Sequence, residues 1–139
     1  MESKLEYIFK GEVPKKEENK GVIILLHGYG SNENQLMDTI DSVHSDYFVV
    51  AIKAPLILPR GMSGKGWCTI NFDNGIKSYN LEELEESRKL VIDFIDYMKS
   101  TYEIDPDNVL LFGYSQGAVM AQVVALTKPE AIKGSIALS

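Results

Sequence analysis

The sequence has little of what marks several large classes of protein. Cys68 is the single cysteine among 139 residues, which excludes an internal disulfide and suits a reducing cytoplasm. No apolar run approaches the roughly 20 residues of a membrane-spanning helix, and residues 1–20 lack the apolar core of a secretory signal. Only 14 Lys and Arg stand against 20 Asp and Glu, so nucleic acid is not an expected partner. We expect a cytoplasmic protein with no transmembrane segment, no metal and no cofactor.

What the chain does have is an alternation of apolar runs with amphipathic stretches. Short apolar or alternating runs predict strands over 4–10, 22–26, 47–55, 109–112 and 134–138. Helical spacing of apolar residues predicts helices over 33–44, 81–102 and 116–126. Buried strands that alternate with helices predict an α/β fold, with a mainly parallel sheet and helices on both faces. No repeat or linker divides residues 1–139, so we expect a single domain.

Three segments carry more specific expectations. Ser31 or Asn32 can cap the helix predicted over 33–44, and Asn80 can cap the helix over 81–102, with Glu83 at the capping-box position. Residues 56–80, rich in Gly, Ser and Asn, are predicted to form a long functional loop. In parallel sheets the active crevice lies at the carboxyl ends of the strands, so this loop should meet the residues that follow strands 22–26 and 109–112.

The most informative motif is the stretch "GYSQG", residues 113–117, between a predicted strand and a predicted helix. A sharp strand-to-helix turn of this kind presents a nucleophilic serine, here Ser115, and crowds the positions two before and two after it. Glycine fits such crowded positions, which accounts for Gly113 and Gly117. The turn also directs the N–H of Gln116 toward a bound carbonyl. The alternative is a serine in an ordinary glycine-rich turn, or a turn that binds phosphate.

A second motif, "HGYG" at residues 27–30, follows the neighbouring predicted strand. An oxyanion hole requires a second N–H from such a strand end, and Tyr29 is in position to supply it. Gly28 lets this loop approach closely, and His27 is expected to hold the loop by a hydrogen bond. Taken alone the motif describes a simple tight turn, but together with the serine turn it predicts an acyl-transfer site.

The sequence resembles the phospholipase/carboxylesterase branch of the α/β-hydrolases, which includes the acyl-protein thioesterases. The resemblance is carried by "VIILLHGYGSNEN", "APLILPRG…GWCTINFD", "LEELEESRKLVIDFI" and "IDPDNVLLFGYSQGAVMAQVVAL". It implies hydrolysis of a small-molecule carboxylic ester or thioester through an acyl-enzyme, with Ser115 as nucleophile and Tyr29 and Gln116 as oxyanion donors. It also implies acyl-chain contacts around Trp67. The competing interpretation of Trp67 is a buried aromatic residue that pins the long loop.

The sequence departs from the family at the catalytic base. In α/β-hydrolases the triad acid and histidine follow the serine in chain order, and residues 116–139 contain no histidine. His44 should lie about 16 Å from the catalytic edge, at the far end of its helix. His27 is at the correct edge but is expected to support the loop, and a carboxylate such as Asp73 activates serine poorly by itself.

These observations leave three interpretations of residues 1–139. The first, which we favour, is an incomplete α/β-hydrolase domain, part of a longer polypeptide whose C-terminal part is missing. The second is half of an assembly that pairs with another chain or with a copy of itself through the exposed last strand. The third interpretation is a non-catalytic module that binds an acyl group or another small ligand. In every case we expect these 139 residues alone to show little or no turnover.

Overall fold

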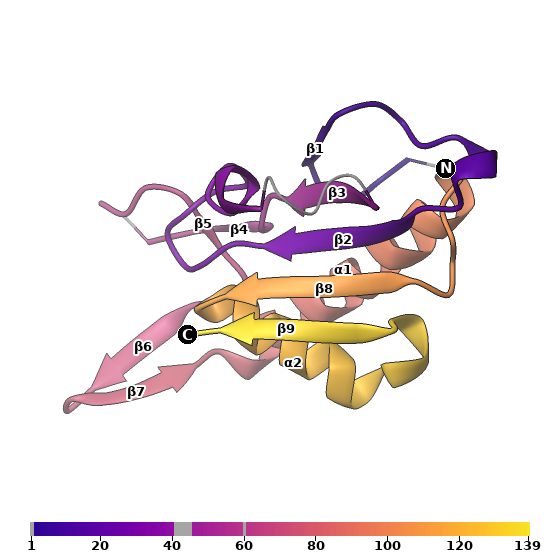
Figure 1. Ribbon diagram of the computed structural model, residues 1–139. Coiled ribbons are helices and arrows are strands. Elements are labelled where there is room, and N and C mark those ends of the chain that lie inside the picture. Colours follow the sequence, from indigo (N-terminus) through magenta and orange to yellow (C-terminus); the bar gives the residue numbers. More distant parts are fainter. Residues whose placement is uncertain (1, 41–45, 60) are drawn as a thin grey trace.

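A computed structural model of the chain describes residues 2–40, 46–59 and 61–139. The central sheet has five strands in the order β1 (Tyr7–Lys10), β3 (Tyr47–Ile52), β2 (Gly21–Leu26), β8 (Val109–Tyr114) and β9 (Gly134–Leu138) (Figure 1). β1 runs antiparallel to β3, and every other neighbouring pair is parallel. The mainly parallel sheet of the predicted α/β fold is thus confirmed, with β2 and β8 adjacent at its centre.

Both α-helices of the described residues, α1 (Leu81–Thr101) and α2 (Gln116–Thr127), pack on one face of this sheet. Helices were predicted on both faces, but in the described part of the chain the opposite face is covered by turns and a 3₁₀ turn, because residues 33–40 do not form the predicted helix. Their apolar side chains form a core with alternate residues of the central strands, among them Val22, Ile24, Val50 and Leu111. The opposite face carries a smaller cluster in which Ile23, Leu25 and Val49 pack against the segment that follows β2. All six residues of β2 are buried, because side chains cover both of its faces.

The helix predicted over 33–44 is wrong for the residues that the structure describes. Turns precede a single 3₁₀ turn, η2 (Met37–Thr39), and residues 41–45, which include Val43 and His44, lie outside the described part. Asn32 Oδ1 accepts a hydrogen bond from the N–H of Asn34, a local contact that competes with helical hydrogen bonding. The apolar stripe still serves burial, since Leu36, Met37 and Ile40 cover the second face of the sheet.

The long loop predicted over 56–80 contains two small antiparallel pairs. β4 (Leu56–Ile57) pairs with β5 (Lys65–Gly66), and β6 (Ile70–Asp73) pairs with β7 (Ile76–Tyr79). Asn74 and Gly75 both have positive φ and connect β6 to β7. An Asn-Gly pair between alternating residues is the strongest short signal for a hairpin, but this hairpin was not among the predicted elements. The β6–β7 hairpin projects beyond the sheet (Figure 1).

The remaining elements follow their predicted ranges closely. Asn80 caps α1 by accepting a hydrogen bond from the N–H of Glu83 at 3.1 Å. The expected capping box does not close, because the Glu83 carboxylate accepts from the N–H of Thr69 instead. The described residues contain two further 3₁₀ turns: η1 (Lys16–Glu18) lies between β1 and β2, and η4 (Pro129–Ala131) lies between α2 and β9. Of the helices in the described part of the chain, none has the length and apolar character needed to cross a membrane.

Candidate active site

Ser115 lies between the last residue of β8 and the first residue of α2, at the carboxyl edge of the sheet. Its backbone has φ 55° and ψ −117°, a conformation that residues with a side chain rarely adopt. Its N–H donates to the carbonyl of Leu138 at 2.8 Å, and its carbonyl accepts from Ala118 and Val119. The serine side chain is exposed and makes no cap with the helix. The turn therefore holds a strained serine with its hydroxyl facing outward.

Gly113 and Gly117 are required by close backbone contacts around this turn. A Cβ at Gly113 would overlap the carbonyl oxygen of Gly117. A Cβ at Gly117 would overlap the carbonyl oxygen of Leu26, the last residue of β2. The absence of both side chains lets the first turn of α2 rest directly on the ends of β8 and β2.

The 27–30 loop lies next to Ser115 because β2 and β8 are neighbours, with Leu26 opposite Gly113. A Cβ built on Gly28 would lie 3.3 Å from the Cβ of Ser115. Neither the N–H of Tyr29 nor that of Gln116 donates a hydrogen bond to another residue within the described ranges. The positive end of the α2 dipole is at the same place. Two uncommitted donors and a helix N-terminus thus lie beside one exposed serine.

His27 is only 2% exposed, and hydrogen bonds occupy both of its ring nitrogens. Nε2 accepts from the backbone N–H of Ala54 at 3.0 Å, so the ring proton is on Nδ1 and is donated to the carbonyl of Gly28 at 2.8 Å. Burial lowers the pKa of His27, although the Gly28 carbonyl and the Glu33 carboxylate oppose this effect. The ring is a neutral support for the 27–30 loop and offers no free nitrogen to Ser115.

The depressed pKa of His27 predicts a loss of stability in weak acid. The unfolded chain binds a proton near pH 6.5, the ordinary pKa of histidine, while the folded chain binds it only at lower pH. The contribution of His27 is therefore complete above about pH 6.5 and falls below it, by up to about 1.4 kcal/mol per pH unit. Urea unfolding from pH 8 to 5 should show this slope, and His27→Gln should flatten it. Equal slopes in the two proteins would contradict the assignment.

Trp67 has no exposed surface and packs in the core between the sheet and the helices. Its indole N–H donates to the carbonyl of His27 at 2.8 Å, and its backbone N–H donates to Oε1 of Gln116 at 2.7 Å. Trp67 borders a cavity of about 160 Å³ beside Pro55 and Ser87, but its lack of exposed surface favours a pin for the long loop over an acyl contact. The side chain of Gln116, whose role the sequence did not reveal, is 3% exposed, and its partners among the described residues are Trp67 and Cys68.

Cys68 follows Trp67 and is equally buried. Burial is the main cause that raises the pKa of its thiol to about 11, so the thiolate is scarce at neutral pH. We expect iodoacetamide at pH 7.5 to leave the native protein unmodified and to alkylate Cys68 only in denaturant. Intact mass measurement distinguishes these states, and rapid alkylation of native protein would show that the segment around Cys68 opens readily.

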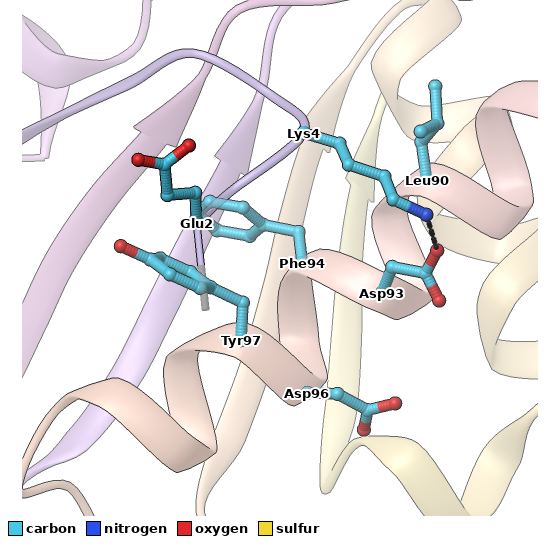
Figure 2. A pocket seen from close by; sticks show the side chains of 7 residues that line it. All are labelled: Glu2, Lys4, Leu90, Asp93, Phe94, Asp96 and Tyr97. Carbon is cyan, nitrogen blue, oxygen red and sulfur yellow. Dashed lines mark hydrogen bonds and ion pairs between the residues drawn. The ribbon is translucent and has the colours of Figure 1, made fainter.

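Two further candidate residues were considered in the sequence, Asp73 and His44. Asp73 lies at the exposed turn of the β6–β7 hairpin, and His44 lies outside the described residues. A cavity of about 310 Å³ lies between α1 and the N-terminal segment, and none of the predicted site residues lines it. Figure 2 shows Phe94 and Tyr97 beside this cavity and the ion pair between Lys4 and Asp93 at 3.4 Å. We therefore place the candidate site at Ser115 and not in this cavity.

Two curated proteins with similar sequences are named as a thioesterase and as a hydrolase. The chain is 28% identical to acyl-protein thioesterase 1 of Kluyveromyces lactis over 134 residues, covering 90% of this chain. It is 24% identical to the putative hydrolase MhqD of Bacillus subtilis over 124 residues, covering 87% of this chain. The chain spans 58% of the length of each of these two relatives.

The fold comparison leads to the same group of proteins. The structure superposes on the Bacillus cereus carboxylesterase with a TM-score of 0.77 and 27% sequence identity, covering 97% of this chain and 59% of that protein. This likeness confirms the predicted α/β-hydrolase fold. The model of the phospholipase/carboxylesterase family matches residues 12–139, and the chain belongs to that family.

Proposed function

We propose that Ser115 is the nucleophile of a serine hydrolase that cleaves carboxylic esters or thioesters through an acyl-enzyme. The observation that carries this proposal is the strained, exposed serine beside two N–H groups without a described acceptor. Membership of a hydrolase family supports the reaction class, and the relatives named as thioesterase and carboxylesterase support the substrate class. The substrate is a small-molecule acyl compound, and a cytoplasmic location is part of the same proposal.

In the proposed reaction Ser115 Oγ attacks the acyl carbon while a base takes its proton. The carbonyl oxygen becomes an oxyanion, and the N–H groups of Tyr29 and Gln116 stabilise it at the N-terminus of α2. The carbon–oxygen or carbon–sulfur bond then breaks, and the leaving group takes up the proton. Water attacks the acyl-enzyme in the same way, which releases the acid and restores the serine hydroxyl.

The base is the part of this machinery that the described residues do not provide. Both ring nitrogens of His27 are hydrogen-bonded to backbone groups, and Asp73 lies at a hairpin turn. We assign the base, and the acid that orients it, to residues outside the described ranges. Residues 1–139 are thus proposed to form one incomplete hydrolase domain that carries the nucleophile and the oxyanion donors.

Labelling with a fluorophosphonate, followed by peptide mapping, tests this proposal. The 139-residue chain should label slowly, and the chain extended by the coding sequence after Ser139 should label on Ser115. Absence of label on Ser115 in the extended protein, with the fold intact by circular dichroism, would refute the proposed function. Ester and thioester substrates of increasing acyl length would then define the specificity of the labelled protein.

The exposed last strand favours a second candidate function. β9 is the edge of the sheet, and its Ile136 and Leu138 are about half exposed. A cavity of about 390 Å³ lies beside this strand, between Leu138, Phe112 and Tyr114 and the segment around Leu36. A non-catalytic module that associates with itself, or that takes an acyl group or another small ligand there, would fit these features. A stable dimer of residues 1–139 that never labels on Ser115 would favour this second function.

A further inference from the structure

Residues 65–69 connect the two halves of the proposed oxyanion hole, and we refer to them as the bridging segment. The segment holds the 27–31 loop at three points, on both sides of Tyr29. The N–H of Gly30 donates to the carbonyl of Lys65 at 2.9 Å, and the N–H of Lys65 donates to the carbonyl of Ser31 at 3.0 Å. On the other side of Tyr29, the indole of Trp67 donates to the carbonyl of His27 at 2.8 Å.

The same segment is joined to the serine turn through the side-chain amide of Gln116. Oε1 accepts from the N–H of Trp67 at 2.7 Å and from the N–H of Cys68 at 3.4 Å. Nε2 donates to the carbonyl of Cys68 at 2.9 Å. Gln116 therefore has two roles. Its backbone provides one proposed oxyanion N–H, and its side chain bonds to the bridging segment, which in turn bonds to the 27–31 loop.

Helix α1 and its N-cap residue Asn80 provide partners for the remaining backbone groups of residues 67–69. Ser87 Oγ donates to the carbonyl of Trp67, and the Glu83 carboxylate accepts from the N–H of Thr69. The carbonyl of Thr69 accepts from the N–H of Asn80 at 2.9 Å. Every backbone N–H and C=O of these three residues thus has a partner, which makes an irregular, mostly buried segment rigid.

We propose that Trp67 is a positioning residue, which fixes the spacing of the Tyr29 and Gln116 N–H groups through the bridging segment. This inference rests on the proposed function. It adds to that function an explanation of how the two oxyanion N–H groups are held in position before substrate binds. A displacement of about 1 Å at such a site can cost about 100-fold in rate, so a rigid link between the two loops has a kinetic consequence.

Trp67→Phe tests the link because it keeps an aromatic ring and the backbone hydrogen bonds but removes the indole donor to His27. The matched control is Phe94→Leu, a loss of ring volume in the same core on α1, away from the bridging segment. In the protein that labels on Ser115, we expect Trp67→Phe to lower kcat by about 10- to 100-fold with KM changed less than about threefold. Phe94→Leu should lower the melting temperature by a similar amount and leave kcat within about twofold.

Amide hydrogen exchange in the 139-residue chain gives a readout that does not depend on turnover. We expect Trp67→Phe to accelerate exchange in residues 27–31 more than Phe94→Leu does, once the rates are compared at equal global stability. The inference is overturned if the two variants give equal exchange there, or equal kcat in the labelled protein. Failure of wild-type protein to label on Ser115 would refute the proposed function instead, and the exchange comparison would still decide whether Trp67 positions the loop.

Discussion

Replacement of Ser115 by glycine is expected to abolish fluorophosphonate labelling and to stabilise the fold. The loss of function follows from removal of the attacking oxygen, which in serine hydrolases costs about 10⁶-fold in kcat. The gain in stability follows from the backbone at residue 115, where φ is 55°. A residue with a side chain in such a conformation stores about 1–3 kcal/mol, part of which the greater freedom of glycine in the unfolded chain offsets.

The net effect should be about 1 kcal/mol of added stability, or about 3–5 °C in melting temperature. Ser115→Ala is the matched control, since it also removes the oxygen but keeps the Cβ and its strain. Its free energy of unfolding should stay within about 0.5 kcal/mol of the original value, because the Ser115 hydroxyl is exposed and makes no cap. Thermal and urea unfolding of the three proteins would measure these differences.

If one substitution abolishes function and raises stability, the original residue has a strained backbone that its function requires. If Ser115→Gly unfolds at the same temperature as Ser115→Ala, the backbone at residue 115 is not strained. Backbone strain would then no longer support Ser115 as the nucleophile. If either variant still labels at the original rate, another residue is the nucleophile.

Gly117→Ala is expected to cause a large loss of stability. The new Cβ would overlap the carbonyl oxygen of Leu26 and lie 2.6 Å from that of His27. Both obstacles are backbone atoms at the end of the central strand, so α2 must move away from the sheet. We expect a destabilisation of about 3 kcal/mol or more, and failure to fold is consistent with the same cause.

Gly134→Ala provides the matched control for this prediction. At the start of β9 a Cβ would meet nothing closer than Cδ2 of Leu110 at 3.6 Å, which is an ordinary contact. This variant should unfold within about 0.5 kcal/mol of the original protein. Equal stabilities for Gly117→Ala and Gly134→Ala would show that α2 does not rest on the end of β2 as described.

The sequence predicted the central sheet and the serine turn because local pattern determines both. The run from Val22 to Leu26 is apolar throughout, which is typical of a strand covered on both faces, and β2 is such a strand. The glycines of "GYSQG" are needed because the backbone of the turn is crowded, so these five residues alone predict the turn. The helix over 33–44 failed because its apolar stripe is compatible with turns, and local Asn32 contacts favour turns in the described residues.

The bridging segment could not be predicted from the sequence by the same reasoning. Gln116 and Trp67 are far apart in the chain, and no periodicity connects a helix N-terminus with a loop. From the sequence, Gln116 was expected to contribute only its backbone N–H, and two interpretations of Trp67 remained open. Only the three-dimensional structure shows that one buried amide side chain satisfies three backbone groups of residues 67 and 68.

The central claim is that Ser115 attacks an acyl carbon whose oxygen is then held by Tyr29 and Gln116. A crystal structure of the phosphonate adduct, in the protein that labels, tests this claim most directly. We predict phosphorus bonded to Ser115 Oγ, with the phosphoryl oxygen about 2.7–3.1 Å from both backbone nitrogens. An adduct on another residue, or a phosphoryl oxygen directed away from these two N–H groups, would contradict the account.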